Sequence, residues 1–136
     1  MNILVPILTL KENDTKFFEE IVKVKPDQVI LLHVMDKSFV NKASSAISDI
    51  MQFRKISLEL IKKLKDKKID CEEISEWGVT TKKIVANSLI HKTNIVFLVD
   101  DKTEFNKEII KELESNKIRY ALIPLDNENT KNLVKK

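Results

Sequence analysis

The sequence is poor in glycine, because Gly78 is the only one among 136 residues. Ordinary usage of about 7% would give roughly ten. Loops that bind phosphate through backbone N–H groups need glycine where the chain turns with positive φ and approaches the anion closely. The scarcity therefore predicts that a nucleotide site of the usual glycine-built kind is absent.

Cysteine and long apolar runs are also scarce. Cys71 is the only cysteine, which excludes a disulfide within the chain and fits a reducing cytosol. No stretch approaches the ~20 apolar residues of a membrane span. The apolar residues 1–10 lack a basic region and soon meet Pro6, which indicates a strand and not a signal peptide. We expect a cytoplasmic protein that does not bind membranes.

The charges are nearly balanced, with 24 basic and 21 acidic side chains and a net charge of +3. Lysine runs at residues 62–68 and 82–83 resemble those of nucleic-acid-binding proteins. Interleaved acidic residues and the lack of aromatic side chains that could stack on bases favour a solvated helix face instead. We therefore expect no nucleic-acid partner.

Apolar runs and helical periodicity alternate along the whole chain. The pattern predicts an α/β fold of the Rossmann-like kind, with a five-stranded parallel sheet and helices on both faces, in one domain over residues 1–126. The polar residues 127–136 are predicted to form a tail. Alternating polarity predicts that residues 69–75 form an edge strand. Strands are expected at residues 2–8, 28–34, 69–75, 94–99 and 118–125, and helices from Asn13 or Asp14 to before Pro26, over 42–67, from Thr80 or Thr81 to Ile90, and from Thr103 or Asn106 onward.

Ligands of such folds bind outside the carboxyl ends of the strands, where the strand order reverses. Four side chains are candidates for this crevice: His33, Trp77, Asp100 and Lys102. We expect Trp77 in a loop at the crevice mouth. There it could stack on a flat ligand or contact a partner, but a lone tryptophan can equally cover its own core.

No metal centre or catalytic group is predicted. Asp36, Asp100, Asp101 and Asp126 follow strand ends, so the fold would gather them along one rim that could hold a hard cation. Aspartate also caps helices and begins turns, which needs no ligand, and no spacing matches a cation loop. The two histidines and the one cysteine are not spaced as zinc ligands. The sequence also shows no serine or cysteine with a general base that could activate it as a nucleophile.

Four segments resemble the universal stress protein family. Residues 2–7 and 29–34 are similar to its first two strands, and residues 120–124 to its last. The strongest similarity runs from Gly78 through Ile84 and Ala86 to residues 94–99. The resemblance implies a stress-response module that forms a homodimer through its fifth strand, with Ile118, Tyr120 and Leu122 at the dimer edge.

The chain departs from the ATP-binding members of that family. Those members resemble one another in a glycine-rich stretch after the fourth strand and an aspartate after the first. Here residues 99–107 contain no glycine, and Leu8 replaces the aspartate. The resemblance therefore implies a regulatory protein of the non-ATP-binding kind, with no cofactor and no enzymatic activity. The alternative is a small ligand or nucleotide held in the crevice by side chains such as His33, Trp77 and Lys102.

Overall fold

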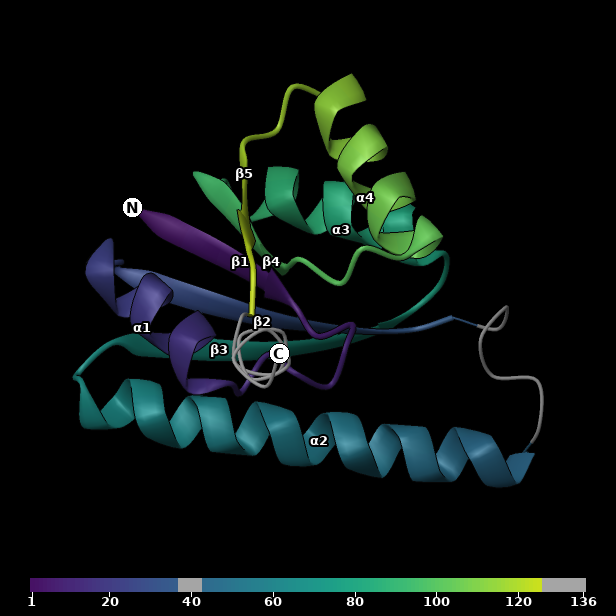
Figure 1. The fold of residues 1–136 in the computed structure, drawn as a ribbon, viewed down its shortest axis with the longest axis horizontal. Helices are drawn as coiled ribbons and strands as arrows, with labels where there is room; N and C mark the ends of the chain where they lie inside the picture. Colours follow the sequence, from purple (N-terminus) through teal and green to yellow (C-terminus); the bar gives the residue numbers. More distant parts are fainter. Residues whose placement is uncertain (37–42, 126–136) are drawn as a thin grey trace, which may run out of the picture.

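The computed structural model describes residues 1–36 and 43–125, with the backbone alone for residues 43–49. Strands and helices alternate within these residues, and all strand pairs are parallel in the order β3-β2-β1-β4-β5 (Figure 1). The predicted α/β fold is thus confirmed. The elements are β1 (Asn2–Pro6), α1 (Thr15–Lys23), β2 (Gln28–Met35), α2 (Ala43–Asp66), β3 (Asp70–Trp77), α3 (Thr80–Ile90), β4 (Ile95–Val99), α4 (Glu104–Ser115) and β5 (Tyr120–Ile123).

Each face of the sheet is covered by a separate apolar core. Ile3 and Val5 of β1 pack with α1 and α2, whereas Leu4 between them packs with α3 and α4. Successive strand side chains point to opposite faces, so a strand covered on both faces must be apolar throughout. This is why the central strands are continuous apolar runs in the sequence.

The two edge strands differ in charge. β3 lies at one edge, as predicted, and carries four carboxylates in eight residues, Asp70, Glu72, Glu73 and Glu76. β5 lies at the other edge and has the uncharged sequence Tyr-Ala-Leu-Ile. Charged side chains deter an edge strand from pairing with another chain. Only the β5 edge is therefore suited to sheet extension.

Lysine takes the place of glycine where the helices end. Lys68, Lys92 and Lys117 follow α2, α3 and α4 with φ of 60°, 52° and 58°. In each case two backbone bonds close the helix end, as between Ile69 N–H and the Leu64 carbonyl at 3.0 Å and between Lys68 N–H and the Lys65 carbonyl at 2.9 Å. This is the Schellman arrangement, in which glycine is the usual left-handed residue. The chain thus forms left-handed turns without glycine.

The helix starts agree with the prediction at two of three positions. Asp14 caps α1 and Thr103 caps α4 through side-chain oxygens that accept backbone N–H groups. The expectation that Thr80 or Thr81 caps α3 is wrong. Thr80 is already helical and Val79 stands at the cap position without a side-chain bond, because the carboxylate of Asp36, directly after β2, replaces the local cap.

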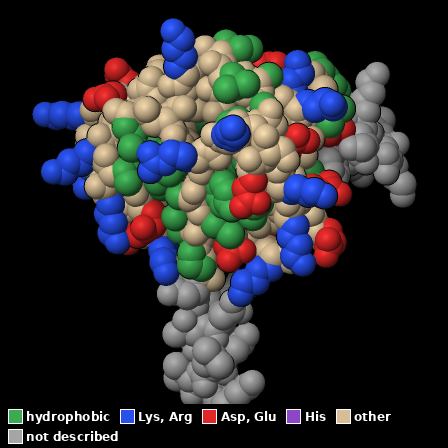
Figure 2. Space-filling model, turned by 90° about the horizontal axis from the view of Figure 1, so that it is seen from above, with side chains coloured by type: hydrophobic (Ala, Val, Ile, Leu, Met, Phe, Trp, Pro, Cys, Tyr) green, Lys and Arg blue, Asp and Glu red, His purple; other side chains and the backbone are tan. Residues whose placement is uncertain are grey.

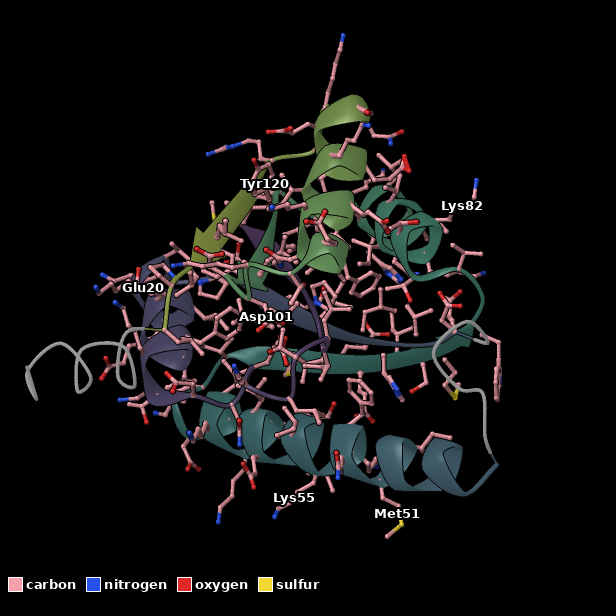
Figure 3. All side chains as sticks on the ribbon, turned by 45° about the vertical axis from the view of Figure 1, so that its right-hand side comes forward. Glu20, Met51, Lys55, Lys82, Asp101 and Tyr120 are labelled. Atoms are coloured by element: carbon pink, nitrogen blue, oxygen red, sulfur yellow. The ribbon has the colours of Figure 1, made fainter. Side chains whose placement is uncertain are left out.

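The face of the molecule seen in Figure 2 carries both signs of charge. Figure 2 shows basic and acidic side chains interleaved with apolar ones, without a large field of one sign. Met51 and Lys55 project from α2 away from the sheet (Figure 3). Across the two described stretches of chain, no helix is both long and apolar enough to cross a membrane.

Candidate functional site

A cavity of about 270 Å³ opens at the carboxyl ends of β1 and β2. It lies beside the point between β1 and β4 where the strand order reverses, which is where ligands of such sheets bind. Its size is slightly below the range of typical small-molecule sites. The lining residues are Ile7, Leu8, Thr9, Leu10, His33, Val34, Met35, Asp36, Ile50, Phe53, Thr80 and Phe105.

One wall of the cavity is a stacked aromatic pair. The His33 ring from β2 lies 4.3 Å from the Phe53 ring of α2, centroid to centroid, with 28° between their planes. Burial lowers the pKa of His33, and the nearby Glu73 carboxylate opposes this shift only in part. The shift favours the uncharged imidazole, so this aromatic wall is largely without charge near neutral pH.

Asp36 ties the end of β2 to the start of α3. The Asp36 side chain is buried, and its Oδ2 accepts hydrogen bonds from Thr80 N–H at 2.8 Å and from Thr80 Oγ1 at 3.0 Å. A carboxylate at a helix N-terminus satisfies an orphan N–H group and complements the positive end of the helix dipole. Asp36 therefore acts as the cap of α3 from 44 residues away.

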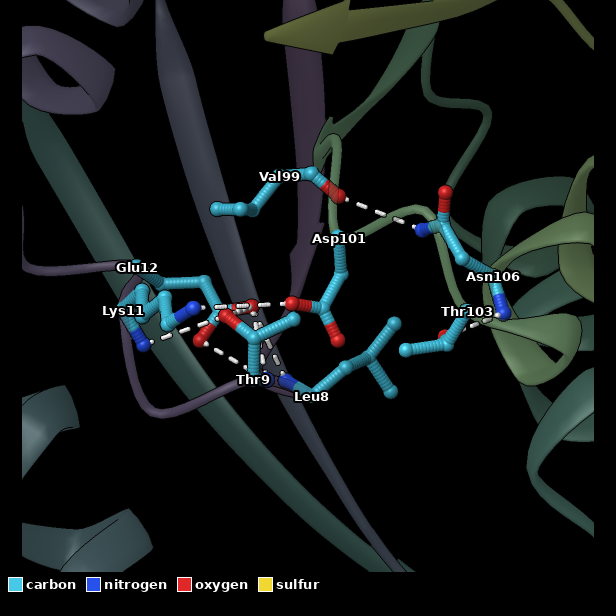
Figure 4. A network of polar contacts seen from close by, with 8 residues as sticks. All are labelled: Leu8, Thr9, Lys11, Glu12, Val99, Asp101, Thr103 and Asn106. Atoms are coloured by element: carbon cyan, nitrogen blue, oxygen red, sulfur yellow. Dashed lines mark hydrogen bonds and ion pairs between the residues drawn. The ribbon is translucent and has the colours of Figure 1, made fainter. Parts of the chain in front are cut away.

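Glu12 fills the loop that follows β1 (Figure 4). Its side chain is almost completely buried, and Oε2 accepts the N–H groups of Leu8 at 3.1 Å and Thr9 at 3.0 Å and the Thr9 hydroxyl at 3.0 Å. Burial raises the pKa of Glu12, while these hydrogen bonds oppose the rise. Consecutive backbone N–H groups of this kind form an anion-binding nest. Here the nest holds the chain's own carboxylate.

An ion pair links the loops after β1 and β4. Lys11 Nζ lies 3.6 Å from Asp101 Oδ1, above the reversal in strand order. The loop after β4 is anchored in turn by the Asn106 amide, which donates to the Val99 carbonyl at 3.2 Å. Lys102, between these anchors, has φ of 56° and is exposed. The two loops are therefore closed by contacts within the chain.

Of the four crevice candidates, the structure places only His33 in the cavity wall. The expectation of Trp77 in a loop is wrong. Trp77 is the last residue of β3, paired with Met35, and its side chain is 59% exposed. Asp100 is fixed by its N–H bond to the Ile123 carbonyl at 2.8 Å, and neither Asp100 nor Lys102 lines the cavity.

The expected carboxylate rim is not assembled as one group. Asp36 is committed to α3 and Asp101 to Lys11, while Asp126 lies outside the described residues. Among the residues that the structure describes, no three His, Cys, Asp or Glu side chains lie together as metal ligands. Asp36 and Asp101 instead tie a strand end and a loop to neighbouring elements.

Two residues of the site escaped the sequence analysis, Glu12 and Phe53. Glu12 has a local signal, because residues 9–12 read Thr-Leu-Lys-Glu, the spacing in which a glutamate reaches back to an N–H three residues earlier. The structure uses this spacing to close a loop, since α1 begins only at Thr15. Phe53 has no such signal, because only tertiary packing brings it against His33.

The dimer candidates lie at the β5 edge with their side chains half-buried. Ile118, Tyr120 and Leu122 pack against the core formed with α3 and α4. Tyr120 also donates a hydrogen bond from its hydroxyl to Glu114 Oε2 at 2.8 Å, and Figure 3 shows it on β5 beside α4.

The comparisons with known proteins find likeness in structure and none in sequence. No protein-family model matches the chain, and no curated protein matches it.

Solved structures match over almost the whole length. Hypothetical protein MJ0577 is 20% identical with a TM-score of 0.65, covering 93% of this chain and 96% of its own. A universal stress protein family protein from Arabidopsis thaliana, At3g01520, with AMP bound, is 15% identical with a TM-score of 0.64, covering 96% and 95%. A universal stress protein in complex with cAMP is 8% identical with a TM-score of 0.57, covering 91% and 96%. The resemblance seen in the sequence is thus confirmed in three dimensions, and the chain has the fold of the universal stress proteins.

Proposed function

We propose that this chain is a regulatory protein of the universal stress protein family that forms a homodimer, contacts protein partners, catalyses no reaction and does not bind ATP. The observation that carries the proposal is the Glu12 carboxylate in the amide nest after β1. An incoming phosphate would have to displace the Glu12 side chain from Leu8 and Thr9, since both need the same N–H donors.

The second loop at the site adds to this obstacle. Asp100 and Asp101 follow β4 directly, where related proteins have a glycine-rich stretch. The Asp101 charge is balanced by Lys11, so that this ammonium group is engaged before any ligand arrives. A triphosphate would meet carboxylates on both loops, which is unfavourable at short range.

Dimer formation through β5 is supported by the contrast between the two sheet edges. The carbonyls of Arg119 and Ile123 accept hydrogen bonds from the β4 side of the sheet. The alternation of a strand therefore turns the backbone groups of Tyr120 and Leu122 outward. β5 carries no charge that would deter pairing, whereas β3 carries four carboxylates. Pairing with a second β5 would give a closed, two-fold symmetric dimer.

Light scattering and calorimetry test the proposal. The wild type is expected to be a dimer at roughly tens of micromolar, and Leu122→Pro a monomer, because proline removes the outward N–H group. Leu122→Ala is the matched control, since it loses the same side chain but keeps the donor. A strictly monomeric wild type would contradict the dimer, and a calorimetric signal with ATP would contradict the absence of ATP binding.

A second candidate function is the binding of a small ligand, including a nucleotide, by side chains in the crevice. The cavity with its His33–Phe53 wall favours it, and two proteins of the same fold hold AMP and cAMP. Calorimetry with adenosine, AMP and cAMP decides between the candidates. A binding heat with any of these compounds that is lost in His33→Ala would favour ligand binding in the crevice. The absence of heat with all three would contradict it.

A further inference from the structure

A groove lies between α1 and the C-terminal part of α2, on the side of the sheet away from α3 and α4. Its lining residues on α1 are Thr15, Phe18, Glu19, Val22 and Lys23. The opposite side is lined by Lys63 of α2 and by Lys67 in the turn that follows α2. The stripe from Thr15 to Val22 extends roughly 10 Å along the helix axis. A groove that follows one face of a helix for two turns, with a second helix end beside it, offers a surface on which a third helix can pack.

The floor of the groove is apolar and its walls are basic. Phe18 and Val22 are only half-buried, so α1 leaves part of its apolar face uncovered. Three lysines line the groove, Lys23, Lys63 and Lys67, against one carboxylate, Glu19. Lys63 Nζ is held above the floor, 5.7 Å from the Phe18 ring centroid and 3.0 Å from the Asn13 carbonyl, while Lys23 pairs with Glu20 at 2.7 Å.

We propose that this groove binds an amphipathic helix of a protein partner, one that carries Asp or Glu beside its apolar stripe. The inference rests on the proposed role in contacting protein partners and locates the contact. The apolar stripe of the partner would cover Phe18 and Val22, and its carboxylates would meet the lysine walls, the charge complementarity that steers and orients such complexes. Neither a basic helix nor an uncharged one fits these walls as well.

Selection from a peptide library tests the proposal without knowledge of the natural partner. The full-length protein is presented to phage that display helical peptides of about 14 residues, roughly four turns, with random surface positions. Selected peptides are expected to combine an apolar stripe with flanking Asp or Glu. Their affinity is then measured by fluorescence anisotropy on the wild type, on Lys23→Glu/Lys67→Glu, and on the control Lys107→Glu/Lys111→Glu.

The control pair lies on α4, on the other face of the sheet, and makes the same change in net charge. Reversal at Lys23 and Lys67 is expected to weaken binding at least about tenfold, with the control within about twofold of the wild type. Three results would each overturn the proposal. The selected peptides could lack an acidic bias, the two double variants could bind them equally, or anionic lipid vesicles could bind the protein more tightly than any peptide does. Peptide binding by Leu122→Pro distinguishes this proposal from the proposed dimer. If the variant is monomeric and still binds the peptides, the groove does not depend on dimer formation.

Discussion

Removal of the Glu12 carboxylate is the sharpest perturbation that the site offers. In Glu12→Ala, the N–H groups of Leu8 and Thr9 and the Thr9 hydroxyl lose their shared acceptor. A buried donor without a partner costs about 1–3 kcal/mol. The hydroxyl can rotate toward water, which offsets part of the loss, so the free energy of unfolding is expected to fall by about 2–4 kcal/mol.

The pH dependence of the free energy of unfolding provides a second, independent test of Glu12. The pKa of Glu12 is raised in the folded state by burial, so between the ordinary carboxyl value of 4.5 and the raised value the native state binds more protons than the unfolded one. Stability contributed by this group therefore falls as pH rises through that window. Glu12→Gln cannot ionise, so the difference in unfolding free energy, wild type minus Glu12→Gln, is expected to decrease with rising pH.

Urea denaturation followed by far-UV circular dichroism measures both effects. Glu108→Ala on α4 is the control, because Glu108 is exposed and its removal is expected to change stability negligibly. A loss below about 1 kcal/mol in Glu12→Ala would refute the view that this carboxylate satisfies buried donors. A difference between wild type and Glu12→Gln that grows with pH would refute the sign of the pKa shift.

The same variant also tests whether Glu12 prevents phosphate from binding to the amide nest after β1. With Glu12 gone, the Leu8 and Thr9 N–H groups can donate to an external anion, so inorganic phosphate is expected to raise the melting temperature of Glu12→Ala and not of the wild type. The same titration in sodium chloride at equal ionic strength controls for screening. An equal shift in both proteins would mean that Glu12 does not compete with phosphate.

Three further outcomes are expected. Asp36→Ala should lower the free energy of unfolding by about 1–3 kcal/mol in urea denaturation, because α3 loses its cap and a buried hydroxyl loses its acceptor. Lys68→Gly should raise it by about 1 kcal/mol, since glycine relieves the left-handed strain, whereas Lys65→Gly in the helical last turn should lower it by a similar amount. Burial raises the pKa of Cys71 to about 11, so its reaction with a disulfide reagent at pH 8 should be much slower than that of free cysteine and should accelerate as pH rises toward 11.

Local sequence patterns predicted the fold because each element satisfies a local rule. Continuous apolar runs became the central strands, alternating residues 69–75 became an edge strand, and Asp14 and Thr103 cap helices as their positions suggest. The misses arise where distant residues take over a local role. Asp36 caps α3 across the sheet, so Thr80 needs no cap of its own, and pairing with Met35 extends β3 to include Trp77.

The candidate site was less predictable than the fold because its chemistry is assembled by tertiary contacts. His33 was selected for its place near the reversal in strand order, but the ring that faces it, Phe53, lies 20 residues further along the chain in a different element. A sequence shows which residue types are present near a crevice. It does not show which of them are already occupied by one another, and that occupation decides what a site can still bind.

The scarcity of glycine illustrates the same distinction. The sequence predicts no phosphate-binding nest because only one residue, Gly78, turns with positive φ at low cost. Within residues 1–36 and 43–125, six further residues have positive φ, among them Leu10 and Lys102 in the loops beside the site. Left-handed turns are therefore available to this chain at a modest cost in stability, and lack of glycine alone does not prevent a nest. A nest does form after β1, and the physical obstacle to an anionic ligand is the Glu12 carboxylate within it.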